Sequence, residues 1–136
     1  MAHITIIGST TWGTTLAIIN AEEGKHVSLL VRTEKESNLL RKHRENQRFL
    51  PGITFPDTLE ITSRSQDLIP KTNLLIIAVP SQTLRGNVRA ISNYISEPTI
   101  IVSASKGLES TSGMRMTEII EEEIPNLSPD NLCALS

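Results

Sequence analysis

The sequence is poor in cysteine, has no excess of charge of one sign and has no long hydrophobic run. Its one cysteine, Cys133, cannot form a disulfide within the chain, which fits a reducing cytoplasm. Thirteen basic and 15 acidic residues give a net charge of −2, which argues against a nucleic-acid or anionic-membrane surface. The longest apolar run, residues 74–79, is far shorter than the roughly 20 residues that span a bilayer. Since the first residues also lack a basic leader, we expect a cytoplasmic protein without a membrane span.

The length and composition indicate one folded domain over residues 1–136. Hydrophobic residues make up 38% of the chain and charged residues 21%, which is typical of a globular protein and excludes a disordered one. A chain of 136 residues is long enough for one domain with a real core and too short for two domains. No internal repeat is present, and apolar runs alternate with amphipathic stretches along the chain.

Short aliphatic runs alternate with helical patterns, which predicts an α/β fold. Several of these runs are apolar almost throughout, as in a parallel sheet that is covered on both faces. The β-α-β order predicts a Rossmann-type, doubly wound, mainly parallel sheet with helices on both faces. The expected strands are residues 3–7, 27–31, 74–79, 99–102, a weaker 59–62 and 131–135. The expected helices are residues 12–23, 34–44, 81–91 and 116–124, and a long loop is expected over residues 46–65.

The turn after the first expected strand carries glycines in the pattern of a phosphate-binding loop. It reads Gly8-Ser9-Thr10-Thr11-Trp12-Gly13, with Gly8 and Gly13 at the outer positions of the dinucleotide-binding fingerprint. Thr10 occupies the middle position, where its side chain could crowd a pyrophosphate or donate a hydrogen bond to it. Because the turn opens a helix within a β-α-β unit, we expect it to bind a nucleotide. A P-loop is excluded because Thr14 stands where that motif has its lysine.

The end of the second expected strand bears on the choice of cofactor. An acidic residue at this point binds a ribose 2′-hydroxyl, whereas an arginine accommodates a 2′-phosphate. Arg32 lies here and favours NADP, and the nearby Glu34 keeps NAD possible.

Several motifs in sequence order resemble those of the bacterial NAD(P)-dependent glycerol-3-phosphate dehydrogenases. The resemblance extends over nearly the whole chain, and the motifs are specific in combination. They are Gly8 to Leu16 (GSTTWGTTL), Val31-Arg32, Asn46 to Gly52 (NQRFLPG), Ala78 to Ser81 (AVPS) and Lys106 to Glu109 (KGLE).

The resemblance implies an activity, a cofactor and site residues. The activity is the reversible transfer of hydride between dihydroxyacetone phosphate and sn-glycerol 3-phosphate, with NADPH or NADH, to supply the phospholipid backbone. Thr11, Trp12, Arg32 and Phe49 would contact the nucleotide, and Lys106 would contact both cofactor and substrate. The family's general-base lysine and helical substrate domain would lie beyond Ser136, so we expect no catalytic residue and no turnover in these 136 residues. A homodimer of the full-length protein stays open.

Two other functions stay open on the residues alone. A different Rossmann-fold dehydrogenase, such as one acting on a hydroxy acid, would share the fold but not the substrate. A degenerate module that binds no cofactor is supported only by Thr10.

The remaining reactive residues predict no further site. His3, His26 and His43 have no spacing typical of a metal site, so we expect no metal. Cys133 lies in an apolar run and is interpreted as a small buried hydrophobic residue. Arg85 is interpreted as a solvated charge on a helix.

Overall fold

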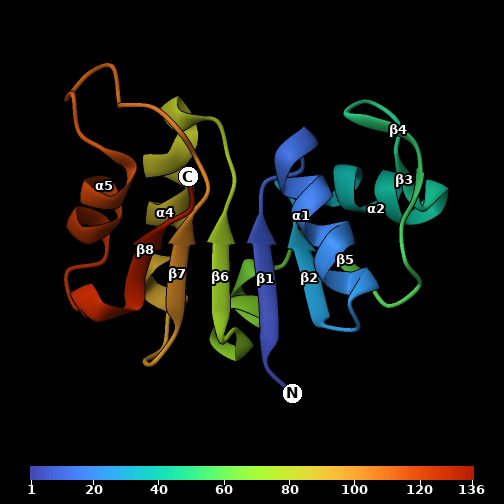
Figure 1. Ribbon diagram of the computed structural model, residues 1–136, viewed down its shortest axis with the longest axis horizontal. Coiled ribbons are helices and arrows are strands. Elements are labelled where there is room, and N and C mark those ends of the chain that lie inside the picture. The colour runs from blue at the N-terminus through green and yellow to red at the C-terminus, as the bar shows by residue number, and fades with distance from the viewer.

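A six-stranded parallel sheet forms the centre of the computed structural model, which describes residues 1–136 (Figure 1). The strand order is β5-β2-β1-β6-β7-β8, and the arrows of β1, β2, β6 and β7 in Figure 1 point the same way. This order runs outward in both directions from β1, which confirms the expected doubly wound sheet. The strands are β1 (His3–Ile7), β2 (His26–Leu30), β5 (Glu60–Thr62), β6 (Leu74–Ile77), β7 (Ile100–Ser103) and β8 (Leu132–Ala134).

Helices cover both faces of the sheet and produce two separate hydrophobic cores. Ile6 of β1 packs with Ile18 of α1 in one core, and Ile77 of β6 packs with Val88 of α4 in the other. Successive strand residues alternate between the two cores because side chains in a strand alternate between faces. No helix is long and apolar enough to cross a membrane. The helices are α1 (Thr11–Glu22), α2 (Glu34–His43), α3 (Ser65–Leu68), α4 (Leu84–Ile91) and α5 (Met116–Glu123).

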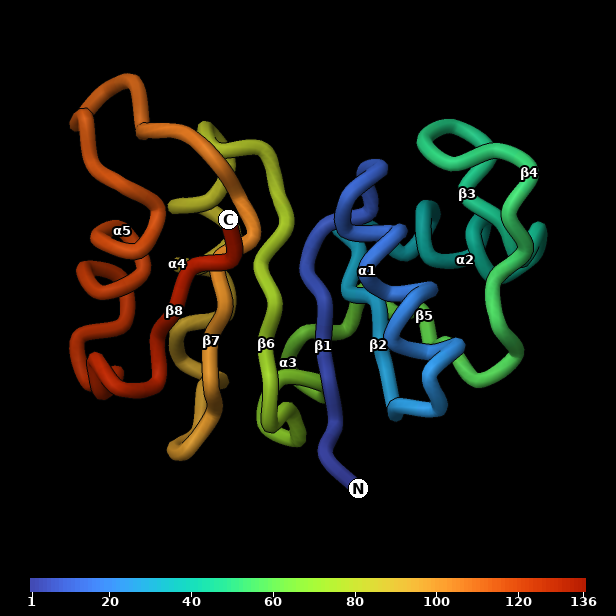
Figure 2. The backbone as a smooth tube through the Cα atoms, viewed as in Figure 1, coloured from blue at the N-terminus to red at the C-terminus, as the bar shows by residue number.

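The segment expected to be a long loop contains a small antiparallel pair, β3 (Glu45–Asn46) and β4 (Leu50–Thr54). This pair is separate from the six-stranded sheet and lies beyond its edge, next to α2 (Figure 2). The sequence could not reveal it because β4 is largely exposed, so it lacks the alternation of buried and exposed residues that marks a strand. The weak strand candidate before residue 63 is confirmed as β5.

The edge strand β8 corrects the interpretation of Cys133, whose side chain is exposed. β8 pairs only with β7 and has little of its surface covered. An apolar run at a sheet edge is therefore less buried than the same run would be at the centre.

The parallel register brings distant histidines together, although their spacing in the sequence predicts no metal site. His3 lies directly opposite His26, and Ser28, two residues further along β2, lies opposite Glu60. These side chains meet at the edge of the sheet where the strands begin.

An ion-pair network joins α4, α5 and the segment after β7. Arg85 of α4 donates two hydrogen bonds of 2.9 Å to the Glu109 carboxylate and one of 2.8 Å to Glu123 of α5. Arg89 donates two further hydrogen bonds to Glu123. Arg85 is therefore half-buried in a network and is not the solvated charge that the sequence indicates.

These hydrogen bonds lower the pKa values of two carboxyl groups. Arg85, helped by Ser112, lowers the pKa of Glu109 to about 2, and Arg89 and Arg85 lower that of Glu123 to about 2. An unfolded glutamate titrates near pH 4.3, about two units higher. The stabilisation is therefore complete above the unfolded pKa and is lost as the pH falls through the folded one.

We expect the wild-type chain to lose stability steadily between about pH 4.5 and pH 2. The variant Glu123→Gln should be less stable at pH 7 and should lose less on acidification, because one of the two groups is removed. Urea unfolding over this pH range measures both effects. Glu121→Gln is the control, since Glu121 lies exposed on the same helix and forms no ion pair. Equal acid sensitivity of the wild type and Glu123→Gln would contradict the analysis.

Candidate functional site

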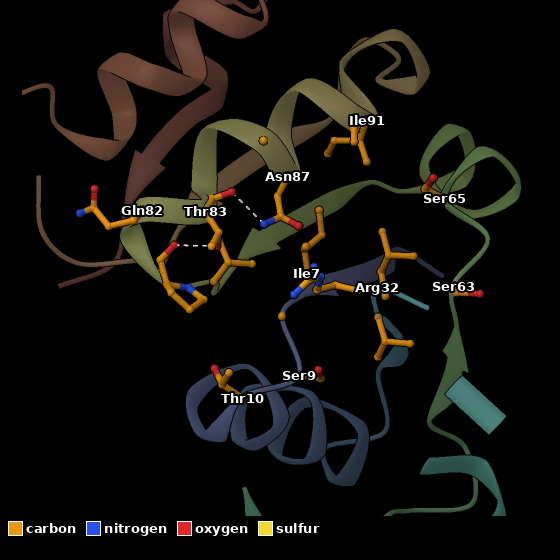
Figure 3. A pocket seen from close by; sticks show the side chains of 17 residues that line it. Ile7, Ser9, Thr10, Arg32, Ser63, Ser65, Gln82, Thr83, Asn87 and Ile91 are labelled. Carbon is orange, nitrogen blue, oxygen red and sulfur yellow. Dashed lines mark hydrogen bonds between the residues drawn. The ribbon is translucent and has the colours of Figure 1, made fainter. Parts of the chain in front are cut away.

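The main cavity lies at the carboxyl edge of the sheet, between the loop after β1 and helix α4 (Figure 3). Its volume is about 580 Å³, and it lies where the strand order reverses between β1 and β6. Figure 3 shows Ser9 and Thr10 on one side and Thr83 and Asn87 on the other. Open α/β sheets bind ligands at this switch point.

Gly8 and Gly13 are required by close backbone packing around the turn from β1 to α1. Gly8 has a φ of +117°, and a Cβ at this position would lie 2.1 Å from the carbonyl oxygen of Ala78. A Cβ on Gly13 would lie 1.9 Å from the carbonyl oxygen of Gly8. Neither separation is possible for real atoms, so only glycine lets the loop pack against the end of β6 and α1 pack against the loop.

The first turn of α1 presents backbone donors beside the cavity. The amide of Thr14 donates to the carbonyl of Thr10 at 3.0 Å, so the amides of residues 11–13 lie ahead of the first α-helical hydrogen bond. Thr10 is the N-cap residue, but its side chain makes no capping hydrogen bond and lines the cavity. Free amides and a free hydroxyl at a helix N-terminus suit an anionic group such as a phosphate.

Arg32 is the only charged residue that lines the cavity. It is exposed and forms no ion pair, so its guanidinium is available to a ligand. Glu34 is directed elsewhere: it accepts hydrogen bonds from Ser63 at 2.7 Å and from Arg41 at 3.1 Å, and its pKa is lowered mainly by the Ser63 hydrogen bond. The electrostatic field in the cavity therefore favours an anion.

The buried Asn46 ties the segment before β4 to the glycine-containing loop. Its Nδ2 donates to the carbonyl of Ser9 at 2.6 Å and to the Thr14 hydroxyl at 2.9 Å. Its Oδ1 accepts from the amide of Phe49, and the Thr11 hydroxyl donates to the carbonyl of Phe49 at 3.0 Å. Phe49 is thus held against the first turn of α1, although it lies far from that turn in the sequence.

Lys106 is exposed and follows β7 at the same edge of the sheet as the cavity. Two contacts from the α4 region hold the segment that carries it. Gln82 Nε2 donates to the carbonyl of Leu108 at 2.9 Å, and Arg85 forms its ion pair with Glu109. The backbone at Lys106 is therefore fixed while its ammonium group stays free.

The structure brings three of the eight predicted cofactor-binding residues into the cavity wall: Gly8, Thr10 and Arg32. Gly13 lies beneath the loop, Trp12 is 46% exposed on the first turn of α1, and Phe49 contacts that turn. Thr11 and Lys106 also lie outside the cavity wall. Sequence analysis missed lining residues on two other segments, namely Ser63, Ser65, Thr83 and Asn87. Ser63 follows the weak strand candidate, so the carboxyl-end rule applied to that strand could have found it.

Comparisons with known proteins match nearly the whole chain to one family. Residues 3–136 match the family described as NAD-dependent glycerol-3-phosphate dehydrogenase N-terminus. A protein of Chlorobium luteolum named glycerol-3-phosphate dehydrogenase (NAD(P)+) is 41% identical over 133 residues, which cover 98% of this chain and 40% of that protein. A protein of the same name from Dehalococcoides mccartyi is 40% identical over 140 residues, with 100% and 38% covered.

Solved structures show the same arrangement. The glycerol-3-phosphate dehydrogenase of Coxiella burnetii superimposes with a TM-score of 0.85 at 26% identity, over 93% of this chain and 38% of that one. That of Saccharomyces cerevisiae gives a TM-score of 0.82 at 25% identity, over 99% and 41%. The chain spans about two fifths of the length of the curated relatives it matches. It belongs to the NAD-dependent glycerol-3-phosphate dehydrogenase family, of which it matches the N-terminal part.

Proposed function

We propose that residues 1–136 form the dinucleotide-binding domain of an NAD(P)-dependent glycerol-3-phosphate dehydrogenase. The whole enzyme would interconvert dihydroxyacetone phosphate and sn-glycerol 3-phosphate, the backbone of phospholipids. The observation that supports this most strongly is the cavity at the β1/β6 switch point, with its glycine-containing loop and a single cation. Family membership supplies the substrate, because the fold alone does not specify it.

The residues of the cavity suit a dinucleotide. The glycine-containing loop and the amides at the start of α1 would hold the pyrophosphate, with the Thr10 hydroxyl as a further donor. Thr11, Trp12 and Phe49 would form the adjoining wall. When bound, the reduced cofactor supplies the hydride that the reaction requires.

Lys106 is proposed to contact both cofactor and substrate. A lysine ammonium at the carboxyl edge can neutralise a substrate phosphate or polarise a carbonyl oxygen. The contacts of Leu108 and Glu109 fix the backbone around it, so orientation depends on the side chain alone. We assign no proton-transfer residue within residues 1–136.

Arg32 is proposed to give a preference for NADPH over NADH. A 2′-phosphate beside a guanidinium gains charge-assisted hydrogen bonds that a 2′-hydroxyl cannot make. The competing carboxylate, Glu34, is occupied by Ser63 and Arg41 and does not line the cavity.

Titration with NADPH and NADH, followed by the fluorescence of Trp12, tests the proposed function. Trp12 is the only tryptophan and lies on the first turn of α1. We expect saturable quenching, with NADPH binding more tightly than NADH. Arg32→Ala should weaken NADPH binding by about tenfold or more, the equivalent of a charged hydrogen bond, and should leave NADH binding nearly unchanged. Lys35→Ala removes an exposed positive charge outside the cavity and is the control. Absence of binding by both nucleotides would overturn the proposal for this chain.

Substitutions of Thr10 decide between the two roles that its side chain could have. If the hydroxyl donates to the pyrophosphate, Thr10→Val should weaken NADPH binding by about tenfold, while Thr10→Ser retains it. Tighter binding by Thr10→Gly than by the wild type would show instead that the side chain crowds the ligand. The same fluorescence titration measures all three variants.

Asn46→Ala should loosen the glycine-containing loop from the segment that carries Phe49. The substitution leaves the Ser9 carbonyl and the amide of Phe49 without their partner, so we expect a loss of about 1–3 kcal/mol in the free energy of unfolding. Nucleotide affinity should fall as well, because the glycine-containing loop loses the hydrogen bond from Asn46 to the carbonyl of Ser9. Urea unfolding and the NADPH titration measure these effects, with the exposed Asn93→Ala as control. An Asn46→Ala variant as stable as Asn93→Ala would show that the tether contributes nothing.

A further inference from the structure

A cluster of two imidazoles and a carboxylate lies at the amino edge of the sheet, away from the cavity. His3, His26 and Glu60 are the first residues of β1, β2 and β5, which lie side by side (Figure 1). One ligand atom from each of the three lies within 4.8 Å of the others. The parallel register produces this arrangement: it places His26 opposite His3 and Glu60 opposite Ser28, which follows His26 by two residues and so lies on the same face of β2.

The three ligand groups lie within reach of one ion once the exposed side chains turn toward it. The His3 and His26 rings are stacked, with centroids 4.0 Å apart and planes at 4°. His26 Nε2 and Glu60 Oε1 are 3.3 Å apart. Two ligand atoms on a tetrahedral zinc ion are also separated by about 3.3 Å, given bonds of about 2.0–2.1 Å. The His26 and Glu60 side chains are 43% and 59% exposed, so they can turn toward an ion that the buried His3 anchors.

The hydrogen bonds around the cluster orient the groups that would bind the ion. The Ser28 hydroxyl donates to Glu60 Oε2 at 3.0 Å, which leaves Oε1 facing His26. The same hydroxyl accepts from His3 Nε2–H at 2.7 Å, which leaves the lone pair of His3 on Nδ1. Partners of this kind fix first-sphere ligands in metalloproteins and are themselves important for affinity.

We propose that His3, His26 and Glu60 form a binding site for a borderline divalent metal ion of the zinc class. Two imidazoles and one carboxylate suit such ions, whereas Ca²⁺ and Mg²⁺ prefer sites made almost wholly of oxygen. Water would fill the remaining coordination positions. Because the ion would bridge three neighbouring strands at the edge opposite the cavity, its role is to stabilise the sheet.

Calorimetric titration with Zn²⁺ tests the site, supported by the visible absorption of the chain loaded with Co²⁺. We expect one ion per chain and a rise in the thermal unfolding midpoint. His26→Ala and Glu60→Gln should each weaken Zn²⁺ binding by at least about tenfold, since even residues that only orient metal ligands contribute that much. Both residues are exposed, so the variants should fold, whereas a change at His3 would disturb the core.

Two matched controls separate this site from other zinc ligands in the chain. His43→Ala removes the third histidine, which is exposed at the end of α2, and Cys133→Ser removes the exposed thiol. Both should bind Zn²⁺ as the wild type does and keep the thermal shift. Failure of the wild type to bind Zn²⁺ at submillimolar concentration, unchanged binding in His26→Ala, or loss of binding in a control would each overturn the proposal.

Discussion

The close packing of the β1–α1 turn against the end of β6 is the constraint on which the rest of the site depends. With no Cβ at Gly8, the loop lies directly on the Ala78 carbonyl, and with none at Gly13, α1 lies directly on the loop. This places the free amides of the first helical turn at the switch point of the sheet. The same contact fixes where α1 crosses the sheet, because Gly13 and Ile18 belong to one helix and Ile18 packs in the core. The close packing at Gly8 and Gly13 therefore positions both the site and the core.

Side-chain hydrogen bonds extend this support to segments that the sheet does not position. Asn46 holds the segment before β4 against the loop after β1 by donating to the carbonyl of Ser9. Ser105 connects the ends of β6 and β7 by accepting a hydrogen bond from the Val79 amide. Gln82 and Arg85 hold the segment after β7 from the side of α4. Each of these links joins residues that lie far apart in the sequence. The loops at the carboxyl edge thus form one connected rim, which can present groups to a ligand with little loss of conformational entropy.

The sequence predicts the central sheet well because the burial of a strand determines which of its residues are apolar, and that pattern is visible in the sequence. A strand covered on both faces must be apolar throughout, so β1, β2, β6 and β7 were recognisable from their residues alone. β3 and β4 were not, since β4 is largely exposed and the pair is tied to the loop after β1 by side-chain hydrogen bonds of Asn46 and Thr11. The same reasoning explains the errors at Cys133 and Arg85. Burial at a sheet edge and ion pairing between helices depend on tertiary neighbours, which a local pattern does not contain.

The site residues also divide into those that the sequence predicts and those that depend on tertiary packing. Gly8 and Arg32 follow from their positions relative to strands, and the cavity wall contains both. The presence of Asn87 in the cavity wall could not be predicted, because tertiary packing decides which face of α4 turns toward the loop after β1. A parallel sheet also aligns all strand starts at one edge and all strand ends at the other, so polar groups separated by tens of residues collect at either edge. The cavity at the carboxyl edge and the His3–His26–Glu60 cluster at the amino edge follow from this single property. Because the rigid sheet lies between them, an ion at one edge can stabilise the fold without contact with a ligand at the other.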